Sequence, residues 1–137
     1  MISTYGGVWL GAVLWAFFGK RVPRLPLLIW LMIGVIPLGV DGFTHFINDI
    51  VAGSSGLGFR DTNEWLRMLT GNVFPDSFYY GNMLGSFNSY ARWFTGLLFG
   101  ITTAFAIFPI VAAGMKDTQQ DIEYQLSRIQ EREAQAS

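Results

Sequence analysis

Three long stretches without a charged residue constrain this chain more than any other feature. Asp, Glu, Lys and Arg are absent from residues 1–19, 25–40 and 93–115. An α-helix rises about 1.5 Å per residue, so about 20 apolar residues cross a hydrocarbon core of roughly 30 Å. Only 14% of the 137 residues are charged, against roughly 25% in soluble proteins. The sequence therefore predicts an all-α integral membrane protein with three transmembrane helices, at about residues 2–19, 25–42 and 93–115.

Basic residues beside the first stretch predict how the spans are oriented. Lys20, Arg21 and Arg24 follow it at once, and Lys and Arg concentrate in cytoplasmic loops. We therefore expect a multi-pass protein of the bacterial cytoplasmic (inner) membrane, with the N-terminus outside and the C-terminus in the cytoplasm. The first stretch is expected to remain in the protein, because no Lys or Arg precedes it and no small-x-small cleavage site follows it.

The connection between the second and third spans predicts a short interfacial helix. Asp61 and Glu64 have the spacing of a capping box, and Gly71 stands where a helix would end. Six aromatic residues between 72 and 92 suit the headgroup level of a bilayer. The expected regions are a transmembrane domain (1–115) that includes an outer interfacial region (43–92), and a polar cytoplasmic tail (116–137).

Two further helical features are expected. Pro37, with Gly34 and Gly39, predicts a kink in the second span, whose helical pattern continues past Asp41. In the tail, one stripe predicts an amphipathic C-terminal helix; it consists of Ile122, Leu126 and Ile129. Because the stripe covers less than two heptads, too few for a coiled coil, this helix either orders against a partner or stays solvated.

Small residues recur at four-residue spacing on the first and third spans. Gly7 and Gly11 form one such pair, and Gly96, Gly100 and Ala104 form the other series. Small residues at this spacing let helix backbones approach closely. These residues are expected to form either a seam within the chain or a docking face for helices of another protein.

Asp41 and His45 form the most suggestive polar pair. They lie four residues apart and share a helix face with Gly34, Pro37 and Asn48. An ionisable pair at a membrane edge can hold a structural hydrogen bond, relay protons, or ligate a haem, pigment or metal through His45. The chain has one His and no Cys, and one His does not build a metal site alone. We therefore favour a structural pair and expect no cofactor and no metal.

The pattern Asn-x-x-x-Arg-x-x-Thr-Gly occurs twice, 25 residues apart. Its copies are Asn63, Arg67, Thr70, Gly71 and Asn88, Arg92, Thr95, Gly96. In one interpretation the arginines reach lipid headgroups and the small residues permit close packing. In the other, Arg67 and Arg92 pair with Asp41, Asp61 or Glu64 in a buried polar cluster, because a charge held near a bilayer needs a partner.

The sequence lacks the features that several classes of function require. A formal net charge of −1 gives nucleic-acid binding no electrostatic basis. The glycine-rich stretch at 53–58 lacks the Lys and the preceding strand of a phosphate-binding loop. A Ser-His-Asp hydrolase is not expected, because no Ser lies in a Gly-x-Ser-x-Gly turn.

Three strings resemble a bacterial and archaeal family of predicted integral membrane proteins of unknown function. They are VDGFTHF (40–46), GFRDTNEWLRMLTG (58–71) and FNSYARWFTGLLFG (87–100). The resemblance extends over roughly residues 5–105 and implies a membrane location without an established activity. His45 stands where many members have Gln. The Cys-containing N-terminal part of the family is absent, so a metal or redox role of those cysteines does not apply.

These observations leave two hypotheses for function. The first is a non-catalytic accessory or structural subunit that packs among lipids and other subunits of a larger membrane complex, such as a photosynthetic or respiratory one. The second is a homo-oligomeric membrane permease or enzyme with an outer-side polar site. The candidate polar cluster for that site comprises Asp41, His45, Arg60, Asp61, Asn63, Arg67, Asn88 and Arg92.

Overall fold

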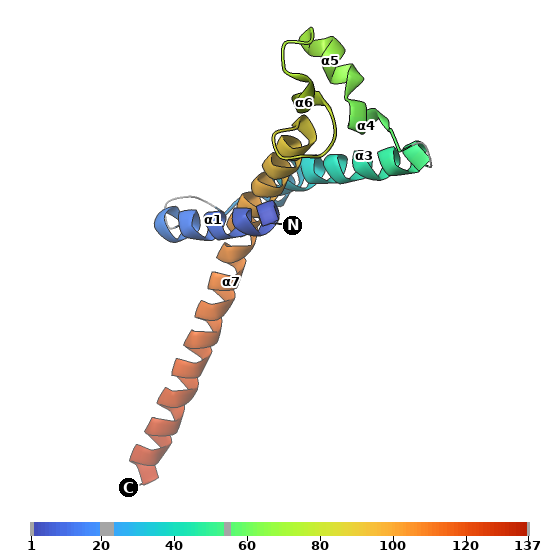
Figure 1. Cartoon of the computed structure of the whole chain (residues 1–137). Coiled ribbons are helices and arrows are strands. Elements are labelled where there is room, and N and C mark those ends of the chain that lie inside the picture. Colours follow the sequence, from blue (N-terminus) through green and yellow to red (C-terminus); the bar gives the residue numbers. More distant parts are fainter. Residues whose placement is uncertain (1, 20–23, 54–55, 137) are drawn as a thin grey trace.

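The computed structural model describes residues 2–19, 24–53 and 56–136, and Figure 1 shows the whole chain. The described residues contain helices and no strands. The helices are α1 (Ile2–Phe18), α2 (Leu27–Ile29), the π-helical η1 (Trp30–Val35), α3 (Ile36–Ala52), α4 (Phe59–Thr62), α5 (Glu64–Thr70), α6 (Asp76–Tyr79) and α7 (Phe87–Ala136). The all-α prediction is confirmed. Lys20 and Arg21, on which the predicted orientation depends, lie outside the described residues.

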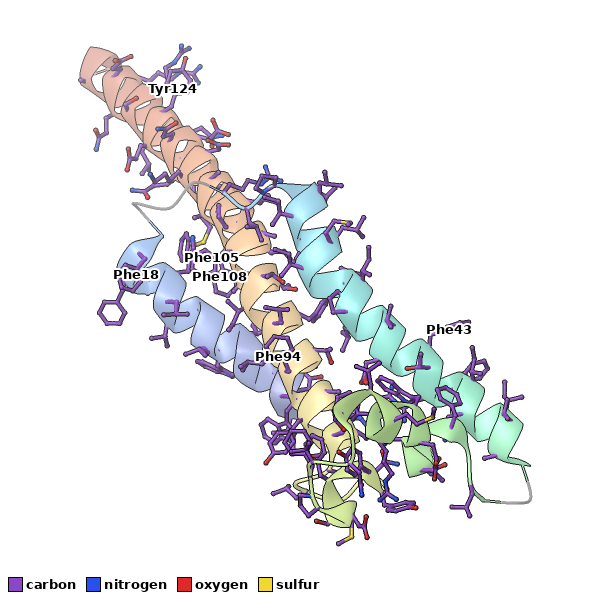
Figure 2. The ribbon with its side chains drawn as sticks, turned by 90° about the horizontal axis from the view of Figure 1, so that it is seen from above. Phe18, Phe43, Phe94, Phe105, Phe108 and Tyr124 are labelled. Carbon is purple, nitrogen blue, oxygen red and sulfur yellow. The ribbon has the colours of Figure 1, made fainter. Side chains whose placement is uncertain are left out.

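Among the described residues, two helices are long and apolar enough to cross a membrane. They are Leu27–Ala52, which joins α2, η1 and α3, and Phe87–Arg132 within α7. The outer faces of the helices carry bare hydrophobic side chains. Figure 2 shows Phe18 and Phe43 pointing away from the neighbouring helices, and Phe43 is 62% exposed. Such a surface fits hydrocarbon rather than water as the surrounding solvent.

The helix α7 lies between α1 on one side and η1 with α3 on the other. Along α1, the small residues make the contact. A Cβ atom added to Gly7 would lie 2.5 Å from the Leu97 carbonyl oxygen, and one added to Gly11 would lie 2.7 Å from Ala104 Cβ. A Cβ atom on Gly100 would strike the backbone of α1. The two small-residue series therefore face each other within the chain and form a seam.

The second helix is irregular just before Pro37. Pro37 has no N–H to donate, and its ring would clash with the carbonyl of Ile33 in an α-helix. The widened π-helical turn η1 ends two residues before Pro37, and the Ile36 N–H bonds to the Leu31 carbonyl. The irregularity expected at Pro37 thus takes the form of a π-turn on its N-terminal side. It directs the Trp30 indole N–H onto Thr103 Oγ1, at 2.9 Å.

One helix continues from the third apolar stretch through the tail. α7 has 50 residues, so it is about 75 Å long, and Figure 1 shows its C-terminal half extending beyond the other helices. Ile122, Leu126 and Ile129 are each just over half exposed. The tail is helical, as expected, and its apolar stripe is uncovered in the single chain.

The short helices α4, α5 and α6 form a cap beside the end of α3 and the start of α7 (Figure 1). The predicted pairing of Asp61 with Glu64 in a capping box is wrong. Asp61 is the third residue of α4, and its carboxylate accepts the Gly58 N–H at 2.8 Å. The helix breaks at Asn63 and restarts as α5, which Gly71 ends in the left-handed conformation (φ 63°), as expected.

Candidate functional site

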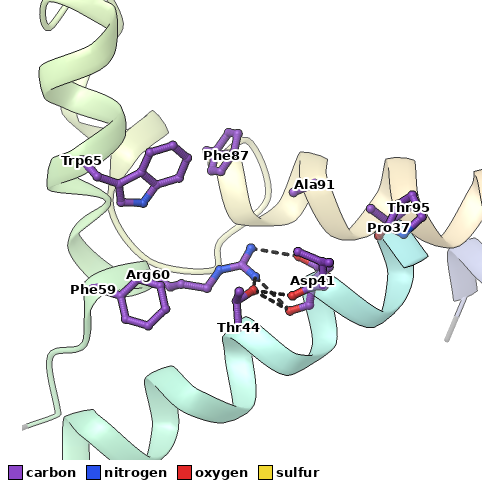
Figure 3. Close-up of a pocket in the computed structure, with 10 residues that line it drawn as sticks. Pro37, Asp41, Thr44, Phe59, Arg60, Trp65, Phe87, Ala91 and Thr95 are labelled. Atoms are coloured by element: carbon purple, nitrogen blue, oxygen red, sulfur yellow. Dashed lines mark hydrogen bonds and ion pairs between the residues drawn. The ribbon is translucent and has the colours of Figure 1, made fainter. Parts of the chain in front are cut away.

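The side chain of Arg60 lies at the centre of a buried polar cluster between α3, α4 and α7 (Figure 3). Its Nη2 donates to Asp41 Oδ1 at 2.9 Å and to Asn88 Oδ1 at 3.2 Å. Its Nη1 donates to the Asp41 carbonyl at 2.9 Å and to Thr44 Oγ1 at 2.6 Å, and its Nε donates to Asn88 Oδ1 at 3.3 Å. A guanidinium has five N–H donors. All five are therefore used inside the chain.

Two buried asparagines hold the backbone around Arg60. Asn88 is fully buried and donates to the carbonyls of Arg60 and Gly81, at 2.5 and 3.0 Å. Asn48, 3% exposed, accepts the Arg60 N–H at 2.7 Å and donates to Asp61 Oδ2 at 2.9 Å. The hydrogen bonds from Asn48 and from the Gly58 N–H hold the pKa of Asp61 below its ordinary value of 3.8. α3 and α7 are thus both tied to α4.

A second cluster surrounds Tyr79, which is fully buried. Asn63 Nδ2 donates to the Tyr79 carbonyl at 2.6 Å, and the tyrosine hydroxyl lies 2.6 Å from Thr70 Oγ1. The Arg67 guanidinium lies 5.2 Å from the centre of the Tyr79 ring and pairs with Asp76. The first copy of the repeated pattern therefore converges on Tyr79.

The two arginines of the repeated pattern do not pair as predicted. Arg67 pairs with Asp76, and Arg92 Nη2 lies 2.8 Å from His45 Nε2. Neither arginine therefore pairs with Asp41, Asp61 or Glu64, as the second interpretation expects; Asp41 pairs with Arg60, which the motif does not contain. The copies are thus alike in sequence and different in their contacts. In each, however, the Asn is fully buried.

Asp41 and His45 are further apart than a hydrogen bond allows. Asp41 Oδ1 lies 4.0 Å from His45 Nε2. Arg92 is a donor only, so Nε2 accepts its hydrogen bond and the imidazole in this arrangement is the neutral tautomer with its proton on Nδ1. The Nε2 atom of His45 is thus already engaged by Arg92. In the part of the chain that the structure describes, no three His, Asp or Glu residues gather as a metal-binding group would require.

The polarity of α5 is inverted. Arg67 and Thr70, with Asn63 just before the helix, face Tyr79, whereas Met68 and Leu69 are 83% and 81% exposed. Glu64, the first residue of the helix, is exposed as well. A water-soluble protein would place these two sets the other way round. The outer face of this helix is therefore suited to an apolar surrounding.

A cavity of about 470 Å³, here called the wedge cavity, lies between α3 and α7 below α4 and α5. Figure 3 shows Trp65 and Phe87 on one side of it and Asp41 and Thr44 on the other. Its remaining walls include Val40, Phe59, Arg60 and Ala91. The cavity lining is therefore mostly apolar, and Asp41, Thr44 and Arg60 form its small polar wall.

Sequence reasoning left four residues of these clusters out of the predicted set: Asn48, Thr44, Tyr79 and Asp76. Asn48 had a signal, because it shares a helix face with Asp41 and His45. Thr44 lies three residues after Asp41 and four before Asn48, so the same spacing could have found it, whereas Tyr79 had no signal beyond its aromatic character. The eight predicted cluster residues fall into separate groups, with Asp41, Arg60, Asp61 and Asn88 around one centre and Asn63 with Arg67 around Tyr79.

Comparison with known proteins identifies the family. A family model described as predicted membrane protein (DUF2085) matches residues 1–80. No curated protein and no solved structure matches the chain. The matched residues include the buried Asp41–Arg60 pair and Tyr79, and end before Asn88 and Arg92. Because the match covers more than half of the 137 residues, the resemblance seen in the sequence is confirmed, and the chain belongs to the DUF2085 family of predicted membrane proteins of unknown function.

Proposed function

We propose that this protein is a non-catalytic accessory or structural subunit of a larger membrane complex, and that its polar cluster fastens the cap to the helices. The observation that carries this proposal is the complete use of the Arg60 donors by Asp41, Thr44 and Asn88. A cation that binds a substrate must keep donors for it. Arg60 within the described structure offers none, which supports a structural role for this side chain.

The proposal includes three spans, with α1 as the additional one. α1 has 17 residues, about 26 Å, which lies at the short end of the range for a membrane-spanning helix. It packs against the uncharged part of α7 through Gly7 and Gly11, and this supports a similar depth for both helices. The chain then lies in the bacterial cytoplasmic membrane with its N-terminus outside, and α5 is an interfacial helix.

Contacts with partner subunits are proposed on two surfaces. The small-residue seam is used inside the chain, so it is not available to a foreign helix. The tail stripe remains uncovered; it consists of Ile122, Leu126 and Ile129. The outward face of α5 is also bare, with Met68 and Leu69 exposed. Apolar surfaces of this kind are typical of protein or lipid contact.

Purification in mild detergent followed by mass spectrometry tests this proposal. We expect the full chain to be recovered at fixed stoichiometry with unrelated membrane subunits. Leu126→Glu should release those subunits, and the neighbouring Gln125→Glu should not. Recovery only as a homo-oligomer would reject the accessory role and favour the second hypothesis, a homo-oligomeric permease or enzyme.

A further inference from the structure

The wedge cavity has the size and walls of a small-molecule site. Its volume of about 470 Å³ falls within the range of ligand pockets, roughly 300–1,000 Å³. Trp65 and Phe87 meet edge to face with ring centres 5.8 Å apart, and Phe59 adds a third ring to the walls. Apolar cavities take apolar guests more readily than water. The body of a guest here is therefore hydrophobic.

The cavity is reached from the apolar side of the molecule. Val40 is 57% exposed, Trp65 is 47% exposed and Phe59 is 43% exposed, so the cavity walls continue into the bare outer face of α3. A guest that enters by this route comes from the surrounding apolar phase. This continuity indicates a membrane-soluble molecule.

The polar wall of the cavity can accept a hydrogen bond from a guest, and the Arg60 donors in it are already used within the chain. Asp41 is 8% exposed, and its Oδ1 accepts from Arg60. Its Oδ2 accepts no hydrogen bond from any residue of the described ranges, although a carboxylate has about four acceptor positions. Arg60 has all its donors engaged. A guest therefore gains most here by donating a hydrogen bond to Asp41.

The charges in the polar wall favour a guest whose hydrogen-bond donor is uncharged. The Asp41 carboxylate is already paired with the Arg60 guanidinium at 2.9 Å. A cationic guest would bring a second positive charge next to Arg60, and burying an unmatched charge is costly. A hydroxyl group donates one hydrogen bond and carries no charge.

We propose that the wedge cavity binds one membrane-soluble alcohol, with its hydroxyl on Asp41 and its hydrocarbon body between Trp65, Phe59 and Phe87. This site is independent of the accessory role, because it needs no partner subunit. The chemistry that the site recognises is a single hydroxyl on a long hydrophobic body.

Tryptophan fluorescence of the full chain in detergent micelles tests the proposal. The probe is dibrominated octadecanol, because bromine quenches an indole that it contacts. We expect saturable quenching that disappears in Trp65→Phe, since Trp65 lines the cavity. The methyl ether of the same probe lacks the donor and should bind about tenfold more weakly. A brominated phosphatidylcholine distinguishes this binding from contact with bulk lipid, and should quench without saturation.

Two matched variants separate site binding from partitioning. Ala91→Phe fills the cavity from α7, and we expect it to abolish the saturable quenching. Ala134→Phe places the same side chain at the exposed C-terminal end of α7 and should leave the quenching unchanged. If Ala91→Phe does not fold, Val40→Trp fills the cavity from α3 and is measured by retention of the brominated alcohol. Equal binding of alcohol and ether, or saturable binding undiminished in a folded cavity-filled variant, would overturn the proposal.

Discussion

Arg60 and Asp41 join two helices through a hydrogen bond of 2.9 Å between Nη2 and Oδ1, and each side chain is more than nine-tenths buried. Arg60 stands in α4 and Asp41 in α3, so the contact fastens the cap to a candidate transmembrane helix. Removing one partner of a buried ion pair strongly lowers the stability of the fold, because the remaining charge has no water to solvate it. The pair therefore determines where the cap sits.

Replacing Arg60 by Gln should release the cap. We expect the free energy of unfolding to fall by about 3–5 kcal/mol, the usual cost of leaving a buried charge unpaired. Unfolding in mixed detergent micelles, titrated with dodecyl sulfate, measures the loss. Arg92→Gln is the matched control, because the Arg92–His45 contact is exposed and such contacts contribute about 0–1 kcal/mol. Equal losses of unfolding free energy in both variants would show that the buried Arg60–Asp41 pair stabilises the fold no more than the exposed Arg92–His45 contact.

Gly100→Ala should destabilise the seam between α1 and α7. The added Cβ atom would strike the backbone of α1 at Thr4 and Val8, and backbone cannot move aside cheaply. We expect a loss of about 1–3 kcal/mol, as for overpacked cores. Gly42→Ala on α3 is the control, because its Cβ atom would meet nothing within 4 Å and Ala favours a helix. A neutral Gly100→Ala would contradict the close seam.

Asp61→Asn should change how stability depends on acid. The pKa of Asp61 is below 3.8 in the folded chain because Asn48 and the Gly58 N–H donate to the carboxylate. Its stabilising contribution is therefore complete above about pH 3.8 and is lost as the pH falls through the lower, folded pKa. The native chain should thus exceed the variant in stability at neutral pH, and the difference should shrink below that pH.

The control for the acid dependence is Asp117→Asn, on the exposed part of α7 that projects away from the cap. Its difference from the native chain should stay constant with pH. A constant difference for Asp61→Asn would remove the proposed role of that carboxylate.

A thiol on the outward face of α5 should react as if in lipid. The chain has no cysteine, so a single thiol reports its own surroundings. Leu69→Cys, in reconstituted vesicles, should react with a lipid-soluble maleimide and poorly with a sulfonated one. Asn82→Cys, at an exposed position in the loop between α6 and α7, should react with both. Rapid reaction of both thiols with the sulfonated reagent would place α5 in water.

The helices could be predicted from the sequence because charge exclusion and helix-ending residues are local signals. The three uncharged stretches each coincide with a helix, and Gly71 ends α5 as its backbone freedom allows. The π-turn at Trp30–Val35 could not be predicted, because Pro37 requires an adjustment without specifying which one.

The polar pairings could not be predicted for a different reason. Spacing shows which residues share a face, and it correctly grouped Asp41 with Asn48. It does not show which of the three arginines at positions 60, 67 and 92 reaches an acid across the fold. Arg60 reaches Asp41 because the Asn48 side chain accepts the Arg60 N–H and holds the Arg60 backbone beside α3. Asn48 fits there because residue 58 is a glycine, since a Cβ atom on Gly58 would overlap the Asn48 side chain.

Three membrane spans place the two ends of the chain on opposite sides of the membrane, whereas two spans place them on the same side. Ile2 and Ser127 are both exposed, so Ile2→Cys and Ser127→Cys can each be labelled in intact cells with a membrane-impermeant maleimide. Three spans predict that the thiol at position 2 is labelled at once and the thiol at position 127 only after the membrane is opened. Labelling of both thiols from the same side would leave only two spans and exclude α1 as a membrane-spanning helix.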